Sequence, residues 1–147
     1  MGTRALDDLS SPFRLRVNAV LARLMEHNTP VMIVQTLRTL EGHQQNLING
    51  TSSVALSKHL PRILRGYPVE PDKCDAIDLC PYSSWEAHGP DKLSWDDTDP
   101  IFALIGQFGE AEGLRWGGRW AHPHDPGHLE LVLPAPPSHP TPKEQSL

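Results

Sequence analysis

The stretch DPGHLEL at residues 125–131 combines a turn signal with a strand signal. Asp-Pro-Gly is typical of a turn, and the alternation that begins at His128 predicts a β-strand. Two further stretches place a metal-binding residue type near a predicted strand or loop, namely SKH at 57–59 and DAIDL at 75–79. Because neighbouring strands bring such positions together, we expect the three stretches to form one site.

The three stretches offer the residue types that hold catalytic zinc. His59, Asp78 and His128 are the candidate ligands. Two histidines, one carboxylate and an open fourth position are typical of catalytic zinc, whereas structural zinc has four protein ligands. The pattern therefore points to hydrolysis rather than to binding alone, and Asp125 is left to act on a water held by the metal.

Size and composition indicate one globular domain. The chain has 147 residues, 38% of them hydrophobic and 21% charged, which is enough for a sizeable core. The net charge of −5 and the pI near 5.8 argue against nucleic acid as a partner and give no polybasic membrane anchor. We expect a monomer.

The sequence shows neither a pattern typical of a membrane-spanning helix nor one typical of a secretion signal. No segment approaches the ~20 apolar residues that cross a bilayer, and the start, MGTRALDDLSSPF, has acids where a signal peptide is apolar. We therefore expect a cytoplasmic protein. Cys74 and Cys80 would lie about 20 Å apart on an extended strand, too far for a disulfide, so we interpret them as free buried thiols.

Helices and strands are expected to alternate irregularly. Ser11 is the predicted cap of a first helix, with Pro12 at its first position, and Asp99-Pro100 predicts the start of another. The remaining expected elements are a strand at 31–36, a helix at 38–49, a loop at 60–73, and strands at 74–79, 114–118 and 128–133. The pattern favours the α+β class, with a small, mainly antiparallel sheet packed by about three helices.

Residues 1–133 are expected to form a single catalytic domain. From Pro134 onward the sequence APPSHPTPKEQSL cannot bury a core. We predict a disordered, Pro-rich tail at 134–147.

Five motifs in order resemble the zinc D-alanyl-D-alanine peptidases of the VanY/VanX type. The chain is most similar to their phage branch of L-alanyl-D-glutamate endopeptidases. The resemblance covers about residues 12–133 and rests on an R-[ST]…Q…L…G stretch, an SxH segment, an AxD segment, a GL-WGG-W segment and D-x-x-H. In this chain these are Leu37-Arg38-Thr39 with Gln44 or Gln45, Ser57-Lys58-His59, Ala76-Ile77-Asp78, 113–120 and 125–128.

The resemblance implies a hedgehog/DD-peptidase-like fold and a division of roles. It implies Zn²⁺ held by His59, Asp78 and His128, with Asp125 as general base. By family position, Arg38 is the candidate for stabilising the oxyanion or for holding a substrate carboxylate. Ser57 and Trp116 are the candidate substrate-binding residues.

The sequence departs from the family in one place. Eighteen residues, 60–77, separate the first His from the Asp, where the family has a short spacer. The ligands can meet only if the extra residues form an excursion from the domain.

Several residues have alternative interpretations. His122 and His124 are rivals for the metal, and Glu130 is a weaker rival for the role of base because it shares a strand face with His128. Asp125 could cap the Pro-Gly turn. Ser57 could likewise cap its turn instead of touching substrate.

These expectations lead to one function and its alternatives. We expect a zinc metallopeptidase that cuts peptidoglycan stem peptides, namely an L-alanyl-D-glutamate endopeptidase of a phage or prophage. Such a lysin would wait in the cytoplasm and reach the cell wall through a holin pore. The alternatives are a D-Ala-D-Ala carboxypeptidase or dipeptidase, and a non-catalytic, metal-stabilised wall-binding module.

Overall fold

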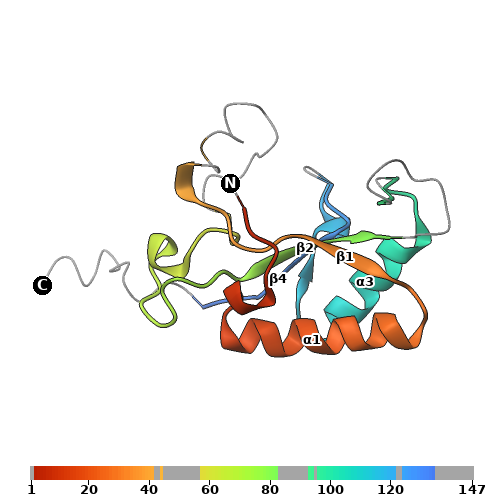
Figure 1. Ribbon diagram of the computed structural model, residues 1–147, viewed down its shortest axis with the longest axis horizontal. Coiled ribbons are helices and arrows are strands. Elements are labelled where there is room, and N and C mark those ends of the chain that lie inside the picture. Colours follow the sequence, from red (N-terminus) through yellow and green to blue (C-terminus); the bar gives the residue numbers. More distant parts are fainter. Residues whose placement is uncertain are drawn as a thin grey trace, which may run out of the picture.

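The computed structural model describes residues 2–41, 44, 57–82, 93–94, 96–121 and 124–134 (Figure 1). Its α-helices, strands and 3-10 helices (η) follow one another along the chain. In order they are η1 (Leu6–Asp8), α1 (Ser11–Glu26), β1 (Val31–Gln35), η2 (Arg62–Arg65), β2 (Ala76–Pro81), α3 (Pro100–Ala111), β3 (Arg115–Trp116), η3 (Gly117–Arg119) and β4 (His128–Glu130).

The four strands form one antiparallel sheet in the order β1-β2-β4-β3. Helices α1 and α3 contact each other, and they lie below the sheet in Figure 1. The predicted α+β class with a small antiparallel sheet is confirmed. Two of the about three expected helices are complete within the described residues. None of the helices in this part of the chain is long and apolar enough to cross a membrane.

Helix α1 carries the apolar stripe that its sequence predicts. Phe13, Val17, Val20 and Leu24 are buried in the core, as the 3.6-residue period requires. The cap differs from the prediction, because the helix begins at Ser11 and Ser10 holds the N-cap position. The Ser10 hydroxyl does not cap the helix, since it donates to the Asp75 carboxylate at 2.5 Å.

Strand β1 agrees with the run predicted at 31–36, although it is a half-buried strand at the edge of the sheet. The helix expected at 38–49 starts later than predicted, because Arg38 lies in an isolated bridge with Gly2. Leu40, Glu41 and Gln44 are helical, and the other residues after 41 lie outside the described part. The same is true of Trp85, Trp95 and the predicted tail from 135 onward, so the predicted domain limits stay predictions.

Helix α3 begins as predicted. The Asp99 carboxylate accepts from the Ile101 amide at 3.0 Å, and proline occupies the first turn. The buried face includes Phe102 beside the expected Ile105 and Phe108. Gly113 follows with φ +78°, a left-handed conformation that glycine adopts without strain.

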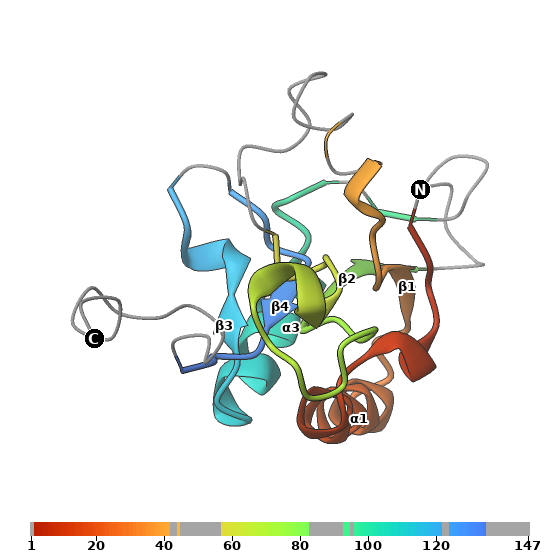
Figure 2. The same cartoon turned by 90° about the vertical axis from the view of Figure 1, so that its left-hand side faces the viewer.

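The 60–73 segment is not the irregular loop that its prolines predict. It contains η2, and two of its side chains, Arg62 and Arg65, are buried. Arg62 donates to both oxygens of the fully buried Asp75, at 2.8 and 2.9 Å, and Arg65 donates to Oδ2 at 2.7 Å. Bidentate pairs of this kind hold both partners in one geometry. Figure 2 shows the segment facing the viewer.

Contacts at its far end tie the 60–73 segment to α1 and to the chain after β4. The Glu70 carboxylate accepts from the Ser11 amide at 2.9 and 3.1 Å, and it thereby satisfies a free N–H group at the start of α1. The Tyr67 hydroxyl donates to the Pro134 carbonyl. The segment is therefore a fastened excursion from the domain, as the meeting of His59 and Asp78 requires.

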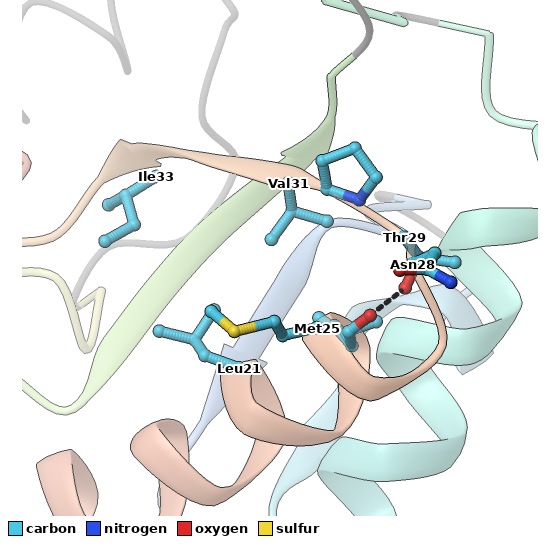
Figure 3. A pocket seen from close by; sticks show the side chains of 8 residues that line it. Leu21, Met25, Asn28, Thr29, Val31 and Ile33 are labelled. Atoms are coloured by element: carbon cyan, nitrogen blue, oxygen red, sulfur yellow. Dashed lines mark hydrogen bonds between the residues drawn. The ribbon is translucent and has the colours of Figure 1, made fainter.

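An apolar cavity of about 560 Å³ lies between the end of α1 and the start of β1 (Figure 3). It is lined by Leu21, Leu24, Met25, Asn28, Thr29, Pro30, Val31 and Ile33. None of these residues is an acid, a base or a ligand for zinc, so the cavity has no part in the chemistry considered below.

We predict that Asp75→Asn destabilises the fold by about 3 to 5 kcal/mol, because it leaves two buried arginines without their counter-charge. Urea unfolding in the presence of a chelator measures the change. The matched control is Asp7→Asn, which removes an exposed partner of Arg14 and should cost about 0 to 1 kcal/mol. Equal effects of the two substitutions would contradict the structural role of Asp75.

The acid stability of the chain should depend on the same carboxylate. Burial alone would raise the pKa of Asp75, but Arg62, Ser10 and Arg65 outweigh it and hold the pKa below its ordinary value. Its contribution is therefore complete above the unfolded pKa of about 3.9 and is lost as the pH falls from there through the folded pKa. Between pH 5 and pH 2, Asp75→Asn should lose less stability than the unchanged chain.

Candidate active site

The register of the central strands places two of the three candidate ligands, Asp78 and His128, side by side. Asp78 on β2 pairs directly with His128 on β4, and Gln35 on β1 pairs with Asp78 from the other side. Directly opposed residues point to the same face of a sheet. A row of three polar side chains therefore crosses one face of three neighbouring strands.

His59 reaches this row from a turn outside the sheet. Its amide donates to the Ser57 hydroxyl at 3.1 Å, and its carbonyl accepts from the Arg38 amide at 2.8 Å. The preceding carbonyl, of Lys58, accepts from the Asp75 amide at 2.9 Å. Backbone contacts on both sides therefore fix the turn against the chain before β2.

The three candidate ligands converge. His59 Nε2 lies 3.2 Å and His128 Nδ1 lies 3.0 Å from the same oxygen, Asp78 Oδ1. One donor atom of each residue falls within 4.8 Å of the others, which is the one such group among the described residues. Both histidines are buried, whereas the side chain of Asp78 is 23% exposed. The group is therefore open to solvent on its carboxylate side.

Hydrogen bonds on the far side of each ring decide which nitrogen faces the group. His59 Nδ1 lies 2.6 Å from the Thr36 carbonyl, and His128 Nε2 lies 2.9 Å from Glu130 Oε1. A carbonyl or an ionised carboxylate can only accept, so these nitrogens carry protons. His59 Nε2 and His128 Nδ1 are the two atoms that face Asp78, so these are the ring nitrogens that a metal would meet.

Burial and the neighbouring charges act in opposite directions on the pKa values of this group. Burial would raise the pKa of Asp78, but the charges and hydrogen bonds of the two histidines outweigh it and hold the pKa far below its ordinary value. Burial would lower the pKa of His128, but hydrogen bonds to Asp78 and Glu130 raise it to about 10. The same atoms can bind a divalent cation in place of that proton, so metal and proton compete for them.

The residues present could hold a metal ion. The donor set is two imidazole nitrogens and one carboxylate, with a partly exposed side left for a fourth ligand. Both rings have the backbone or carboxylate partner that zinc-binding histidines ordinarily have. His59, Asp78 and His128 therefore fit the metal that the sequence predicts.

Asp125 stands at the edge of this group. Its Oδ2 lies 3.8 Å from His128 Nδ1, and its side chain is 44% exposed. Its amide donates to the Gly117 carbonyl at 3.1 Å, and a Cβ on Gly117 would lie 2.3 Å from the Asp125 carbonyl oxygen. A side chain at position 117 would collide with this carbonyl, so Gly117 permits the close approach of the Asp125 turn.

The electrostatic surroundings of Asp125 suit a proton acceptor. Partial burial and the charge of Asp78 raise its pKa above the ordinary value, against the lowering effect of nearby cationic groups. A general base works best with a pKa nearer the working pH. The turn after Asp125 is closed by the backbone, because the Asp125 carbonyl accepts from the His128 amide at 3.2 Å. That contact uses the backbone and leaves the carboxylate free to act.

Arg38 is held beside the row of polar side chains. Its Nε and a terminal nitrogen donate to Gln35 Oε1 at 3.0 and 2.5 Å. Burial lowers the pKa of Arg38, whereas the charges of Asp78 and Asp125 raise it. A guanidinium keeps its charge in either case. The chain thus brings one cation next to the two carboxylates.

The two residues predicted to bind substrate make internal contacts. The Ser57 hydroxyl accepts from the His59 amide, as in the turn-capping alternative. The Trp116 indole donates to the Pro126 carbonyl at 2.7 Å, and its ring lies against Gly106 and Gly118. Their contacts with substrate stay predictions.

Other residues join the site without having been singled out for it. The Thr36 carbonyl contacts the His59 ring, and the side-chain carbonyl of Gln35 accepts from Arg38. The ring centroids of Trp120 and His128 lie 5.0 Å apart. Backbone carbonyls leave no signal in a sequence, and Gln35 reaches the site only through strand register. The rival His124 contacts the Trp120 carbonyl instead of the group, and His122 lies outside the described residues.

Sequence comparison links the chain to known peptidases. Residues 74–131 match the family described as D-alanyl-D-alanine carboxypeptidase. The chain is 30% identical over 119 residues to the L-alanyl-D-glutamate peptidase of Escherichia phage T5, covering 68% of this chain and 74% of that protein. This relationship is close enough, and covers enough of both chains, to show common family membership.

Structural comparison gives the same result for the fold. The crystal structure of the Serratia marcescens L-Ala D-Glu endopeptidase ChiX superposes with a TM-score of 0.61. The match covers 90% of this chain and 89% of that one, at 16% identity. At this identity the likeness establishes the shared fold.

Fold, donor set and sequence together define a peptidase of the metal-dependent class. The chain belongs to the peptidase family of its phage T5 relative, and its residues 74–131 match the family model described as D-alanyl-D-alanine carboxypeptidase. The family and fold predicted from the sequence motifs are therefore confirmed.

We predict that His59→Ala, Asp78→Ala and His128→Ala each lower zinc affinity by more than the about 10- to 100-fold that is typical of changes outside the ligand shell. Competition titration against a chromogenic chelator measures the affinity. His124→Ala is the control, because His124 is the described rival and should leave affinity unchanged. A loss with His124→Ala, but not with the other three, would place the metal elsewhere.

Proposed function

We propose that this peptidase hydrolyses the L-alanyl-D-glutamate bond in the stem peptide of peptidoglycan, with zinc held by His59, Asp78 and His128. The observation that carries the proposal is the convergence of three donor atoms within 4.8 Å beside a partly exposed carboxylate, Asp125. The choice of bond is supported by the name of the phage T5 relative, an L-alanyl-D-glutamate peptidase.

The metal and the chain divide the chemistry between them. When bound, zinc supplies a Lewis acid that polarises a carbonyl and lowers the pKa of water towards ~7. The two histidines and Asp78 would hold it, and the Thr36 carbonyl accepts from the far side of the His59 ring. The exposed side of Asp78 leaves room for substrate.

Asp125 moves the proton. Its carboxylate takes a proton from the attacking water as the new carbon–oxygen bond forms, and it passes the proton to the leaving amine as the carbon–nitrogen bond breaks. The raised pKa of Asp125 makes its carboxylate a stronger base for the first of these transfers. Water is consumed, and a carboxylate and an amine are the products.

Arg38 provides positive charge on the same side. Its guanidinium, fixed by Gln35, stabilises the oxyanion of the tetrahedral intermediate or holds a carboxylate of the substrate. The stem peptide is rich in carboxylates, so both roles suit this substrate class.

A second candidate function has its own support. The family that matches residues 74–131 is described as D-alanyl-D-alanine carboxypeptidase, an activity that removes a terminal residue. The same metal, base and cation serve either bond. The two candidates differ in the position of the bond within the stem peptide, and Arg38 would then hold the terminal carboxylate.

The biological setting belongs to the same proposal. A relative from Escherichia phage T5 favours a phage or prophage lysin, which reaches the wall through a holin pore. In this proposal the protein acts on the cell wall as a monomer and has no nucleic-acid partner.

Digestion of purified peptidoglycan by the zinc-loaded protein, followed by mass spectrometry, tests the substrate. We expect fragments with a free amino group on D-glutamate that disappear when a chelator is present and return with added zinc. Loss of a terminal D-alanine instead would favour the carboxypeptidase. Unchanged peptidoglycan from a folded, zinc-loaded sample would contradict both.

Asp125→Asn should lower kcat by about 10²- to 10⁴-fold, because an amide cannot accept the proton. Zinc affinity and thermal stability should change little, since Asp125 is not one of the three ligands. Asp7→Asn is again the control, with full activity expected. Full activity in Asp125→Asn would assign the base to another residue.

Arg38→Met should impair turnover without removing zinc. A fall in kcat at unchanged KM would assign Arg38 to the oxyanion, whereas a rise in KM would assign it to a substrate carboxylate. Arg14→Met, at an exposed ion pair, is the matched control and should match the unchanged chain. Unaltered kcat and KM in Arg38→Met would remove Arg38 from the site.

A further inference from the structure

Glu130 is a buried carboxylate that the proposed mechanism does not use as a base or as a metal ligand. Its residue is only 7% exposed, and it stands two positions after His128 on β4. Residues two apart on a strand share a face. Its Oε1 accepts from His128 Nε2 at 2.9 Å, on the side of the ring that faces away from Asp78.

The second oxygen of Glu130 is held by two cations. Lys58 Nζ lies 2.9 Å from Oε2, and an Arg115 terminal nitrogen lies 3.4 Å from it. Lys58 Nζ also donates to the Leu131 carbonyl at 2.7 Å. The carboxylate is therefore divided, with one oxygen for the imidazole and the other for the cations.

The His128 ring lies between two carboxylates. Its Nε2 points to Glu130 Oε1, and its Nδ1 lies 3.0 Å from Asp78 Oδ1. Because Oε2 of Glu130 is engaged by the cations, only Oε1 faces the ring, and this contact holds the imidazole with Nδ1 turned towards Asp78.

Lys58 also connects two parts of the site along the chain. It directly precedes His59, and its side chain reaches β4 at Glu130 and Leu131. The ion pair thereby joins the turn that carries one candidate ligand to the strand that carries another.

We propose that Glu130 is a positioning residue that turns His128 so that Nδ1 faces the metal, and that Lys58 holds Glu130 in this position. The inference deepens the proposed function, because it rests on His128 being a ligand. Glu130 itself touches neither the metal nor the substrate. Its contribution passes through the orientation and basicity of the imidazole.

Three variants test the proposal by metal binding alone. Glu130→Met removes the acceptor at similar side-chain length, Glu130→Gln keeps an acceptor oxygen without charge, and Lys58→Met removes only the counter-charge. Zinc affinity from competition titration and the visible absorption of the Co²⁺-loaded protein are the readouts. Glu110→Gln is the matched control, because Glu110 pairs with the exposed Arg119.

The expected order of affinities follows from what each variant retains. Glu130→Met should lose about 10- to 100-fold in zinc affinity and shift the Co²⁺ absorption bands, as outer-shell changes at zinc histidines do. Glu130→Gln and Lys58→Met should each lose about 3- to 10-fold, because the hydrogen bond to Nε2 persists in weakened form. Glu110→Gln should match the unchanged chain.

A purely structural role predicts a different pattern. If Glu130 only tied β4 to Lys58, all three variants would lower the melting temperature of the metal-free protein and leave zinc affinity and Co²⁺ bands as in Glu110→Gln. That result would overturn the proposal. Should Glu130→Met fail to fold, Glu130→Gln and Lys58→Met decide, since control-like affinity in both would overturn it too.

The test of Glu130 and the test of the proposed substrate can fail independently of each other. Peptidoglycan that is not cleaved, with zinc affinity that falls in the expected order, would refute the substrate and keep the role of Glu130. If the unchanged chain cleaves peptidoglycan and the three variants bind zinc as tightly as the control, only the role of Glu130 would be refuted.

Discussion

The antiparallel register of β2 against β4 is the constraint on which the site depends. The pair Ile77 and Leu129 faces the core, where both side chains are fully buried, and the next pair, Asp78 and His128, faces the site. Leu129 packs so closely on α3 that Gly109 has no room for a Cβ. A slip of one residue would exchange the two faces of the shifted strand, so hydrophobic burial fixes the positions of these two candidate ligands.

The position of His59, the third candidate ligand, depends on contacts outside the sheet. His59 lies outside the sheet, and the long 60–73 segment separates it from Asp78 along the chain. Buried ion pairs from Arg62 and Arg65 to Asp75 return the chain to the start of β2, and the Thr36 carbonyl fixes the ring. Because loop-closure entropy grows only slowly with length, such an excursion is compatible with a precise site once its ends are fastened.

Sequence patterns predicted the features that depend on hydrophobic periodicity and on contacts between residues close together in the chain. The stripe of α1, the cap at Asp99 and the turn before His128 are local signals, and each was found. The order of the family motifs predicted that the three candidate ligands belong to one site. The role of Gln35 could not be predicted, because strand register places it beside Asp78. Nor could the fastening of 60–73, because its prolines suggested a loop while Asp75, its buried partner, stands outside it.

Ligands from three chain segments have a consequence for the folded chain as a whole. The pairs that meet are separated by 19 and 50 positions, so a bound ion would act as a reversible cross-link among a turn and two strands. Ligands that bind only the folded state stabilise it by RT ln(1 + [L]/Kd), about 2.7 kcal/mol at a hundred times Kd. Resistance of such a protein to heat and proteolysis would therefore follow the free zinc of its surroundings, and a molecule without its ion would be both inactive and easier to degrade.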